Sequence, residues 1–277
     1  MIYLQSFRLS SRKSTCPNIY PYNVFRGKEG IVLFFDPMTI LYGNNGSGKS
    51  TLLNQIANKL SIEGKELATP NTLGTVDYCG RYLGECSFGL GEDEFGRTLK
   101  SIPKDSRYIK SEDILYEIKK IQQREVLRES IAYDRAVSEG VGEQIGMDFL
   151  KSKEGRRLQS DIEFRQEKYS NGETSLQIFN DLLKPNNLYL LDEPEVSLSP
   201  SNQVLLAEKL NEMTRLLGCQ FIIATHSPFM LGTLNAKIYD LDSRDYKEAS
   251  WTELDNVRYF YDFFKEHDKE FNEDLKS

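Results

Sequence analysis

Residues 43–50 match the pattern G-x-x-x-x-G-K-[S/T], the spacing of a phosphate-binding loop. Glycines let such a loop wrap tightly, so that backbone N–H groups and a helix N-terminus face phosphate oxygens. Lys49 would reach the β- and γ-phosphates, and the Ser50 hydroxyl would bind Mg²⁺. The motif therefore predicts ATP and Mg²⁺ as ligands. The predicted binding residues are Gly43, Asn44, Asn45, Gly46, Ser47, Gly48, Lys49, Ser50 and Thr51.

Two adjacent carboxylates follow the apolar run 188–191. Ligands of open α/β folds bind at the carboxyl ends of the strands, which is where these side chains would lie. Asp192 is suited to hold Mg²⁺, usually through water, and Glu193 to act as the general base for an attacking water. An acidic pair after a strand often only caps the next helix. Together with the upstream loop, however, it indicates hydrolysis of a nucleotide.

Two weaker motifs extend this set. Ser170, Asn171, Gly172 and Glu173 precede a predicted helix, and a helix N-terminus binds anions. The same residues form an ordinary N-cap in many proteins. His226 follows the apolar run 221–224, where it could reach a γ-phosphate or the catalytic water. A lone histidine after a strand is more often structural, so its position after the acidic pair is what makes it informative.

The elements that must position these residues follow from hydrophobic periodicity. The apolar runs 2–9, 31–35, 38–42, 188–191, 221–224 and 237–241 predict strands, and we read the last as the final strand. Leucines at helical spacing predict helices over 50–60 and 200–217. This order predicts an α/β fold, a P-loop NTPase with a mixed sheet flanked by helices.

We expect one domain over residues 1–277. Residues 1–63 and 169–250 form the predicted nucleotide-binding core, and 64–168 an inserted, mostly helical subdomain that begins with loops and short strands. Residues 251–277 predict a C-terminal amphipathic helix with a capping box at Ser250 and Glu253. Packing of its apolar face on the core is the favoured interpretation, and a partner-docking surface is the alternative. That face comprises Val257, Phe260, Tyr261, Phe264 and Phe271.

Composition excludes several classes of protein. No apolar run is long enough to span a membrane, and the first residues lack a signal-peptide pattern, so we expect a cytoplasmic protein without direct membrane contact. Two histidines leave little material for a histidine metal site or nuclease centre. The net charge is −7, and residues 240–277 hold twelve acidic against six basic residues. The basic stretches 100–110 and 151–168 are read as solvated helix faces, so charge does not indicate a nucleic-acid surface.

The order of the four motifs resembles the ATP-binding cassette (ABC) ATPases, and more closely their soluble SMC and RecF-like branch. Most similar are the small stand-alone predicted ATPases of bacteria, which share the phrases 20–23, 188–194, 219–228 and 237–240. The resemblance implies that two chains pack head to tail around shared ATP. Ser170 of one chain would bind the γ-phosphate in trans, and His226 would sense it in cis.

Departures from the family pattern mark open questions. The signature reads Y-S-N-G-E instead of L-S-G-G-Q, and Ser199 stands where the D-loop aspartate is usual. No Q-loop glutamine is assignable. An adenine-stacking aromatic could be Tyr20, Tyr22 or Phe25, although core packing is favoured for them.

Several functions fit these residues. The favoured hypothesis is an ATP-dependent homodimeric switch that acts on a separate effector protein or on nucleic acid, and the family resemblance implies a setting of DNA repair or anti-phage defence. The alternative is the nucleotide-binding subunit of a membrane transporter, which the missing Q-loop disfavours. A nucleotide kinase or metabolic transferase would have no use for Ser170 and His226. The last alternative is a degenerate ATP-dependent clamp, a protein that binds ATP but scarcely hydrolyses it.

Overall fold

The computed structural model describes residues 1–14, 18–67, 76–116, 173–196 and 198–273. The chain forms two compact units. The first contains Met1–Lys110, Lys184–Val196 and Gln203–Ser277, and the second contains Ser111–Leu183 and Ser197–Asn202. All strands of the described residues belong to the first unit, so this unit carries the α/β core.

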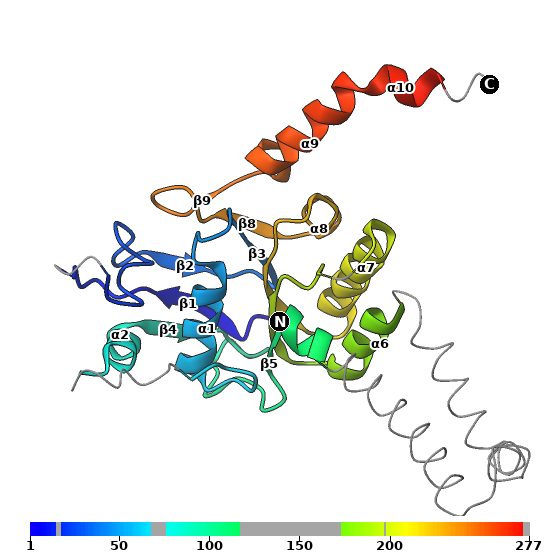
Figure 1. Cartoon of the computed structure of the whole chain (residues 1–277). Coiled ribbons are helices and arrows are strands. Elements are labelled where there is room, and N and C mark those ends of the chain that lie inside the picture. The colour runs from blue at the N-terminus through cyan, green and yellow to red at the C-terminus, as the bar shows by residue number, and fades with distance from the viewer. Residues whose placement is uncertain (15–17, 68–75, 117–172, 197, 274–277) are drawn as a thin grey trace, which may run out of the picture. The chain divides into compact units, whose positions relative to one another are not determined.

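A six-stranded sheet forms the centre of the first unit (Figure 1). Its strand order is β5-β6-β7-β3-β8-β9; the first five strands are parallel, and β9 is antiparallel to β8. Every residue of β3, β6 and β7 is buried, as is typical of parallel strands covered on both faces. The strands are β3 Met38–Tyr42, β5 Arg107–Lys110, β6 Leu188–Asp192, β7 Gln220–Ala224, β8 Lys237–Asp240 and β9 Lys247–Glu248.

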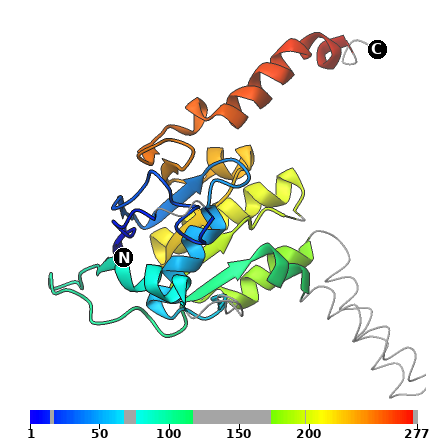
Figure 2. The same ribbon diagram turned by 60° about the vertical axis from the view of Figure 1, so that its left-hand side comes forward.

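A smaller antiparallel sheet has the order β2-β1-β4. Its strands are β1 Leu4–Arg8, β2 Val32–Phe34 and β4 Ser87–Leu90. Helix α1 (Lys49–Leu60) contacts β6 and β7, and both views place it against the parallel sheet (Figures 1 and 2). The remaining helices of this core are α2 Tyr78–Glu85, α7 Pro200–Leu216 and α8 Pro228–Thr233.

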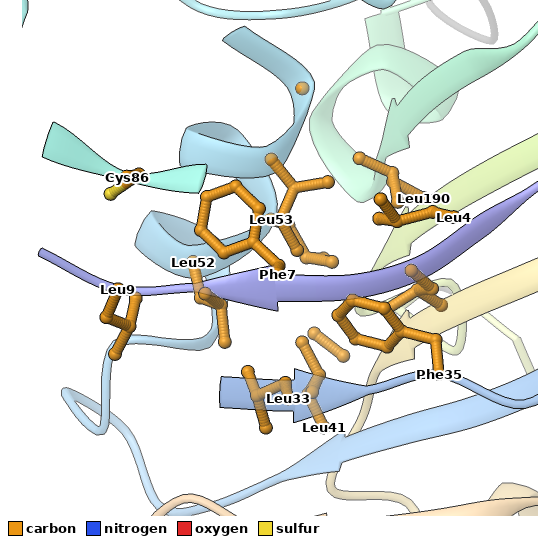
Figure 3. Close-up of a cluster of buried hydrophobic side chains, with 14 of the residues drawn as sticks. Leu4, Phe7, Leu9, Leu33, Phe35, Leu41, Leu52, Leu53, Cys86 and Leu190 are labelled. Carbon is orange, nitrogen blue, oxygen red and sulfur yellow. The ribbon is translucent and has the colours of Figure 1, made fainter. Parts of the chain in front are cut away.

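The hydrophobic core lies where α1 and the two sheets meet. Phe7 of β1, Leu53 of α1 and Leu190 of β6 are fully buried and gather in one cluster (Figure 3). Gln220, the first residue of β7, is also fully buried. Its Oε1 accepts the backbone N–H groups of Tyr3 and Leu4 at 2.8 and 2.9 Å, and its Nε2 donates to the Leu4 carbonyl at 2.9 Å. A single satisfied amide therefore joins the parallel sheet to the smaller one.

The second unit is described only in short stretches. Helix α6 (Glu173–Leu182) is its principal described element, with Ile178 and Phe179 buried. Residues 117–172, which include most of the predicted helical insert and the basic stretch 151–168, lie outside the described residues.

The C-terminal segment is helical, as the periodicity predicts, but it is divided into η1 Trp251–Glu253, α9 Asp255–Glu266 and α10 Asp268–Glu273. Glu253 Oε2 accepts the Ser250 N–H at 3.3 Å, as expected for the capping box. The favoured packing of the aromatic face on the core is wrong. Val257 is buried, but Phe260, Tyr261, Phe264 and Phe271 are 44–59% exposed.

Three other expectations differ from the structure. Residues 64–98 contain a helix, α2, besides the expected strand β4. Strand β9 follows β8, so β8 is not the final strand. Strand β5 pairs with β6 inside the first unit, although the sequence placed its residues in the insert. The apolar pair Tyr108–Ile109 was too short a run to indicate a strand. Within the described residues, no helix has the length and apolar character to cross a membrane.

Candidate active site

The phosphate-binding loop connects β3 to α1 and depends on its glycines. Gly46 and Gly48 have φ values of +87° and +95°, a region that other residues rarely adopt. A Cβ on Gly43 would lie 2.5 Å from Ser47 Oγ, and one on Gly48 would lie 2.7 Å from Val24 Cγ1. The loop therefore requires glycine at these positions, and its tight backbone is the form that cradles phosphate.

Lys49 is held over this loop. Its residue is only 5% exposed, and Nζ donates to the Gly43 and Asn44 carbonyl oxygens at 2.8 and 3.2 Å. Ser47 Oγ is buried and has no hydrogen-bond partner among the described residues. A loop that carries a buried ammonium group and a buried, unsatisfied hydroxyl fits the phosphates of ATP.

Asp192 is the last residue of β6 and is 7% exposed. The Tyr108 hydroxyl donates to Asp192 Oδ2 at 3.0 Å, while Oδ1 is buried without a partner among the described residues. Burial raises the pKa of the Asp192 carboxyl, and the Ser50 and Tyr108 hydroxyls oppose that shift. An unsatisfied carboxylate beside the Ser50 hydroxyl fits Mg²⁺, which usually takes one or two protein oxygens and completes its shell with phosphate and water.

Glu193 follows Asp192 in an unusual backbone conformation. Its φ is +47°, and its N–H donates to the Ala224 carbonyl oxygen at 2.9 Å. Non-glycine residues seldom adopt positive φ, and such strain collects at functional sites. The side chain is 30% exposed, with Oε1 placed 3.5 Å from His226 Nδ1. The general-base candidate and the predicted histidine are therefore brought together.

His226 lies just beyond the end of β7, beside the carboxyl end of β6. Its side chain is 45% exposed, and Nδ1 lies 3.7 Å from Glu195 Oε1 as well as 3.5 Å from Glu193 Oε1. The imidazole is therefore flanked by two carboxylates. Sequence reasoning placed Glu193 and His226 correctly at one sheet edge but overlooked Glu195.

Two further polar side chains at this edge were missed. The Tyr108 hydroxyl reaches Asp192 across a separation of 84 residues, and Asp242 Oδ2 accepts the Asn44 N–H of the phosphate-binding loop across 198 residues. Neither stands in a recognisable motif. Their only signal in the sequence is a position within or just after an apolar run that becomes a neighbouring strand.

The adenine-stacking candidates separate clearly. Tyr22 and Phe25 are 8% and 2% exposed and pack on Tyr82, with ring centroids 4.9 and 5.5 Å apart. They belong to the core, as favoured. Tyr20 is 43% exposed, and the Thr51 hydroxyl at the start of α1 lies beside its phenol. Of these candidates, only Tyr20 presents an accessible ring next to the phosphate-binding loop.

The signature segment, residues 170–173, lies mostly outside the described part of the chain. Ser170, Asn171 and Gly172 lie outside the described residues, and Glu173 is the first residue of α6 in the second unit. Their role in binding ATP stays a prediction.

Comparisons with known proteins place the site in a family. The family model described as AAA domain, putative AbiEii toxin, Type IV TA system matches residues 84–232, more than half of the chain. This stretch contains Asp192, Glu193 and His226 and begins after the phosphate-binding loop. No curated protein shows significant similarity to the chain.

Solved structures with a similar arrangement share little sequence. The Smc head domain from Pyrococcus furiosus, bound to the C-terminal domain of ScpA, is 14% identical with a TM-score of 0.40, over 87% of this chain and 93% of that one. The SMC head domain from Thermotoga maritima is 15% identical with a TM-score of 0.41, over 86% and 94%. A nucleotide-free ATP-binding cassette from an ABC transporter is 14% identical with a TM-score of 0.42, over 90% and 92%.

The family match adds to what the geometry shows. An AAA domain is an ATPase domain of the P-loop class, and the first unit holds a phosphate-binding loop together with two carboxylates, Asp192 and Glu193, whose chemistry fits ATP hydrolysis. The chain therefore belongs to the family described as AAA domain, putative AbiEii toxin, Type IV TA system, and it is an ATP-binding ATP hydrolase.

Proposed function

We propose that this ATPase is a molecular switch that hydrolyses ATP–Mg²⁺ at a head-to-tail interface between two copies of the chain. The observation that carries the proposal is the meeting of Lys49, Asp192, Glu193 and His226 at one edge of the parallel sheet. Strands β6, β7 and β3 are neighbours in that sheet, so their carboxyl ends converge there.

Each side chain has a part in hydrolysis that matches its surroundings. Lys49 and the loop N–H groups bind the phosphates, while Ser50 and Asp192 would hold Mg²⁺, which neutralises charge on the transferred phosphoryl group. Glu193 takes a proton from the water that attacks the γ-phosphorus, and ADP departs with the electrons of the broken P–O bond. His226 contacts the γ-phosphate and so distinguishes ATP from ADP.

A second copy is proposed because the catalytic edge is open. The side chains of Glu193 and His226 are 30% and 45% exposed, so a group from another chain can approach them. The proposed group is Ser170 of the partner copy. Contacts to the γ-phosphate from both chains exist only with ATP, and this differential affinity closes the dimer before hydrolysis and opens it afterwards.

The target of the switch is proposed to be a separate effector protein in a defence setting. The description of the family names a putative toxin and a type IV toxin–antitoxin system, which supports this choice. A nucleic-acid target has less support. In the basic stretch 100–110, Arg107 pairs with Glu63 at 2.9 Å and Lys110 with Glu66 at 2.5 Å, so both charges are already engaged.

The dimer is tested with Glu193→Gln, which keeps the shape of the side chain and removes the base. Turnover should fall by about 100-fold or more, while ATP and Mg²⁺ should shift the protein to a dimer in analytical ultracentrifugation. The matched variant is Glu193→Gln with Ser170→Arg, which should bind ATP and stay monomeric. A Glu193→Gln protein that binds ATP yet remains monomeric would contradict the composite site.

The choice of target is tested separately. Wild-type ATPase activity is measured with duplex DNA, with single-stranded DNA and with the products of flanking genes. Stimulation by a flanking protein but not by DNA is the expected result. Strong stimulation by DNA alone would replace the effector with nucleic acid.

A further inference from the structure

Glu195 is the most deeply buried acidic residue at the catalytic edge. It is 6% exposed, compared with 7% for Asp192, and no motif role was assigned to it. Its Oε1 accepts the Thr225 hydroxyl at 2.6 Å and the His226 backbone N–H at 3.2 Å. One carboxylate oxygen therefore fixes both residues at the end of β7.

The rest of this carboxylate is unsatisfied. Among the described residues, Glu195 Oε2 and His226 Nδ1 are both buried without a hydrogen-bond partner. Buried polar atoms are nearly always paired, and an unpaired one is costly, so each exception calls for an explanation. His226 Nδ1 lies 3.7 Å from Glu195 Oε1, slightly longer than a hydrogen bond. A small shift of the imidazole would pair Nδ1 with Oε1, the oxygen that already accepts the Thr225 hydroxyl and the His226 N–H.

We propose that Glu195 is a positioning residue for His226: it anchors the Thr225–His226 backbone and accepts the Nδ1–H of the imidazole, so that Nε2–H is presented to the γ-phosphate. Catalytic hydrogen bonds are often long before the ligand binds and shorten in the complex, which accounts for the present 3.7 Å. The inference rests on the proposed contact between His226 and nucleotide.

Glu193 is less suited to this role, although its Oε1 is nearer to Nδ1. Glu193 must face the attacking water, and its side chain is 30% exposed, against 6% for that of Glu195. Glu193 also makes no hydrogen bond to the backbone of His226 in the described structure, whereas Glu195 does. The two carboxylates beside the imidazole therefore have different roles in this proposal. Glu193 activates the water, and Glu195 orients the ring of His226.

Because burial raises the pKa of the Glu195 carboxyl, its charged form depends on hydrogen-bond donors around it. The Thr225 hydroxyl, the His226 N–H and the nearby imidazole oppose that shift in pKa. A carboxylate in this setting is stabilised by a proton on the facing nitrogen, which selects the Nδ1–H form of the ring. In the same way, a buried carboxylate that accepts the Nδ1–H of a catalytic histidine fixes the tautomer and the orientation of its ring.

The kinetic test uses Glu195→Gln, His226→Ala and the double variant. We expect Glu195→Gln to lower kcat by about 10- to 100-fold, the usual effect of removing a group that orients a catalytic ligand, with KM for ATP changed by less than about threefold. If Glu195 acts through His226, adding Glu195→Gln to His226→Ala has no further effect. Wild-type kcat in Glu195→Gln, or additive losses in the double variant, would overturn the inference.

A spectroscopic test does not depend on turnover. The chain has two histidines, so ¹⁵N-histidine labelling yields signals from His226 and His267 alone. Glu195→Gln should shift the Nδ1 and Nε2 resonances of His226 and leave those of His267 unchanged. The matched control is Glu270→Gln, because Glu270 Oε1 lies 2.7 Å from His267 Nδ1 on an exposed helix. It should shift only His267 and preserve activity.

The outcomes separate this inference from the proposed function. If His226→Ala is impaired but Glu195→Gln has normal kcat and an unchanged His226 spectrum, only the role of Glu195 is refuted. If His226→Ala hydrolyses ATP normally, the proposed role of His226 is refuted, and the role of Glu195 that depends on it is refuted as well. Should Glu195→Gln fail to fold, Thr225→Val removes the 2.6 Å anchoring hydrogen bond and should shift the His226 resonances in the same direction. Unchanged resonances in that variant would overturn the inference.

Discussion

The central parallel strands and the C-terminal helices are both rich in apolar residues, but they differ in how far these residues are buried. Strands β6 and β7 are buried along their whole length, and the side chains of Glu193 and His226 just beyond them reach solvent. On α9, Val257 is the one buried residue, while Tyr259 is 71% exposed. Apolar content therefore does not decide burial. A central parallel strand has a neighbouring strand on each side and a covering layer on each face. A helix that follows the last strand is buried only where another part of the protein packs against it.

The largest expected contrast concerns stability. Leu190 is fully buried in the central cluster, so Leu190→Ala should lower the free energy of unfolding by about 2–5 kcal/mol. Leu205 of α7 is 52% exposed, so Leu205→Ala should change it by less than about 0.5 kcal/mol. Urea denaturation of both variants checks the difference. Equal losses would mean that α7 relies on Leu205 for packing that its exposure does not reveal.

The next largest effect concerns the affinity of the phosphate-binding loop for ATP. Lys49→Ala removes a charge-assisted phosphate contact and should weaken ATP binding by about 1.5–3 kcal/mol. Isothermal calorimetry measures this directly. Lys269→Ala on exposed α10 is the control and should leave the affinity unchanged. Unaltered affinity in Lys49→Ala would refute the assignment of the phosphate-binding loop.

A smaller effect follows from the buried charge of Asp192. Burial raises the pKa of this carboxyl, so the ionised form costs stability at neutral pH in the nucleotide-free protein. Asp192→Asn should raise the free energy of unfolding at pH 7 by on the order of 1 kcal/mol. The advantage should shrink as pH falls through the folded-state pKa of Asp192, because a proton then neutralises the wild-type carboxylate. Thermal melts without Mg²⁺ across this range test the sign, and a constant advantage would contradict it.

The smallest effect is expected in the C-terminal helices. Phe264 is 52% exposed, so Phe264→Gln should change the free energy of unfolding by less than about 0.5 kcal/mol and leave kcat intact. If the aromatic face instead docks a partner, the same substitution should weaken that complex. A loss of several kcal/mol in the isolated protein would show that the helix packs on its own core after all.

Sequence patterns predicted those elements whose structure depends mainly on neighbouring residues in the chain. The phosphate-binding loop, the largely apolar strands β3, β6 and β7, and helix α1 follow from glycine spacing and periodicity. Tyr108 and Asp242 could not be predicted, because each meets its partner only after strands distant in the sequence pair. The exposed aromatic face of α9 shows the converse. Helical periodicity correctly predicted that the segment is helical. It could not predict whether any surface of the protein packs against the aromatic face.

The buried amide of Gln220 has a mechanical consequence. It stands at the first position of β7, and His226 lies two residues beyond the last, so a fully extended chain places them roughly 20 Å apart. Hydrogen bonds fix the Gln220 side chain to Tyr3 and Leu4 at the start of β1. A displacement of β7 along its axis would therefore be transmitted through these hydrogen bonds to β1 of the smaller sheet.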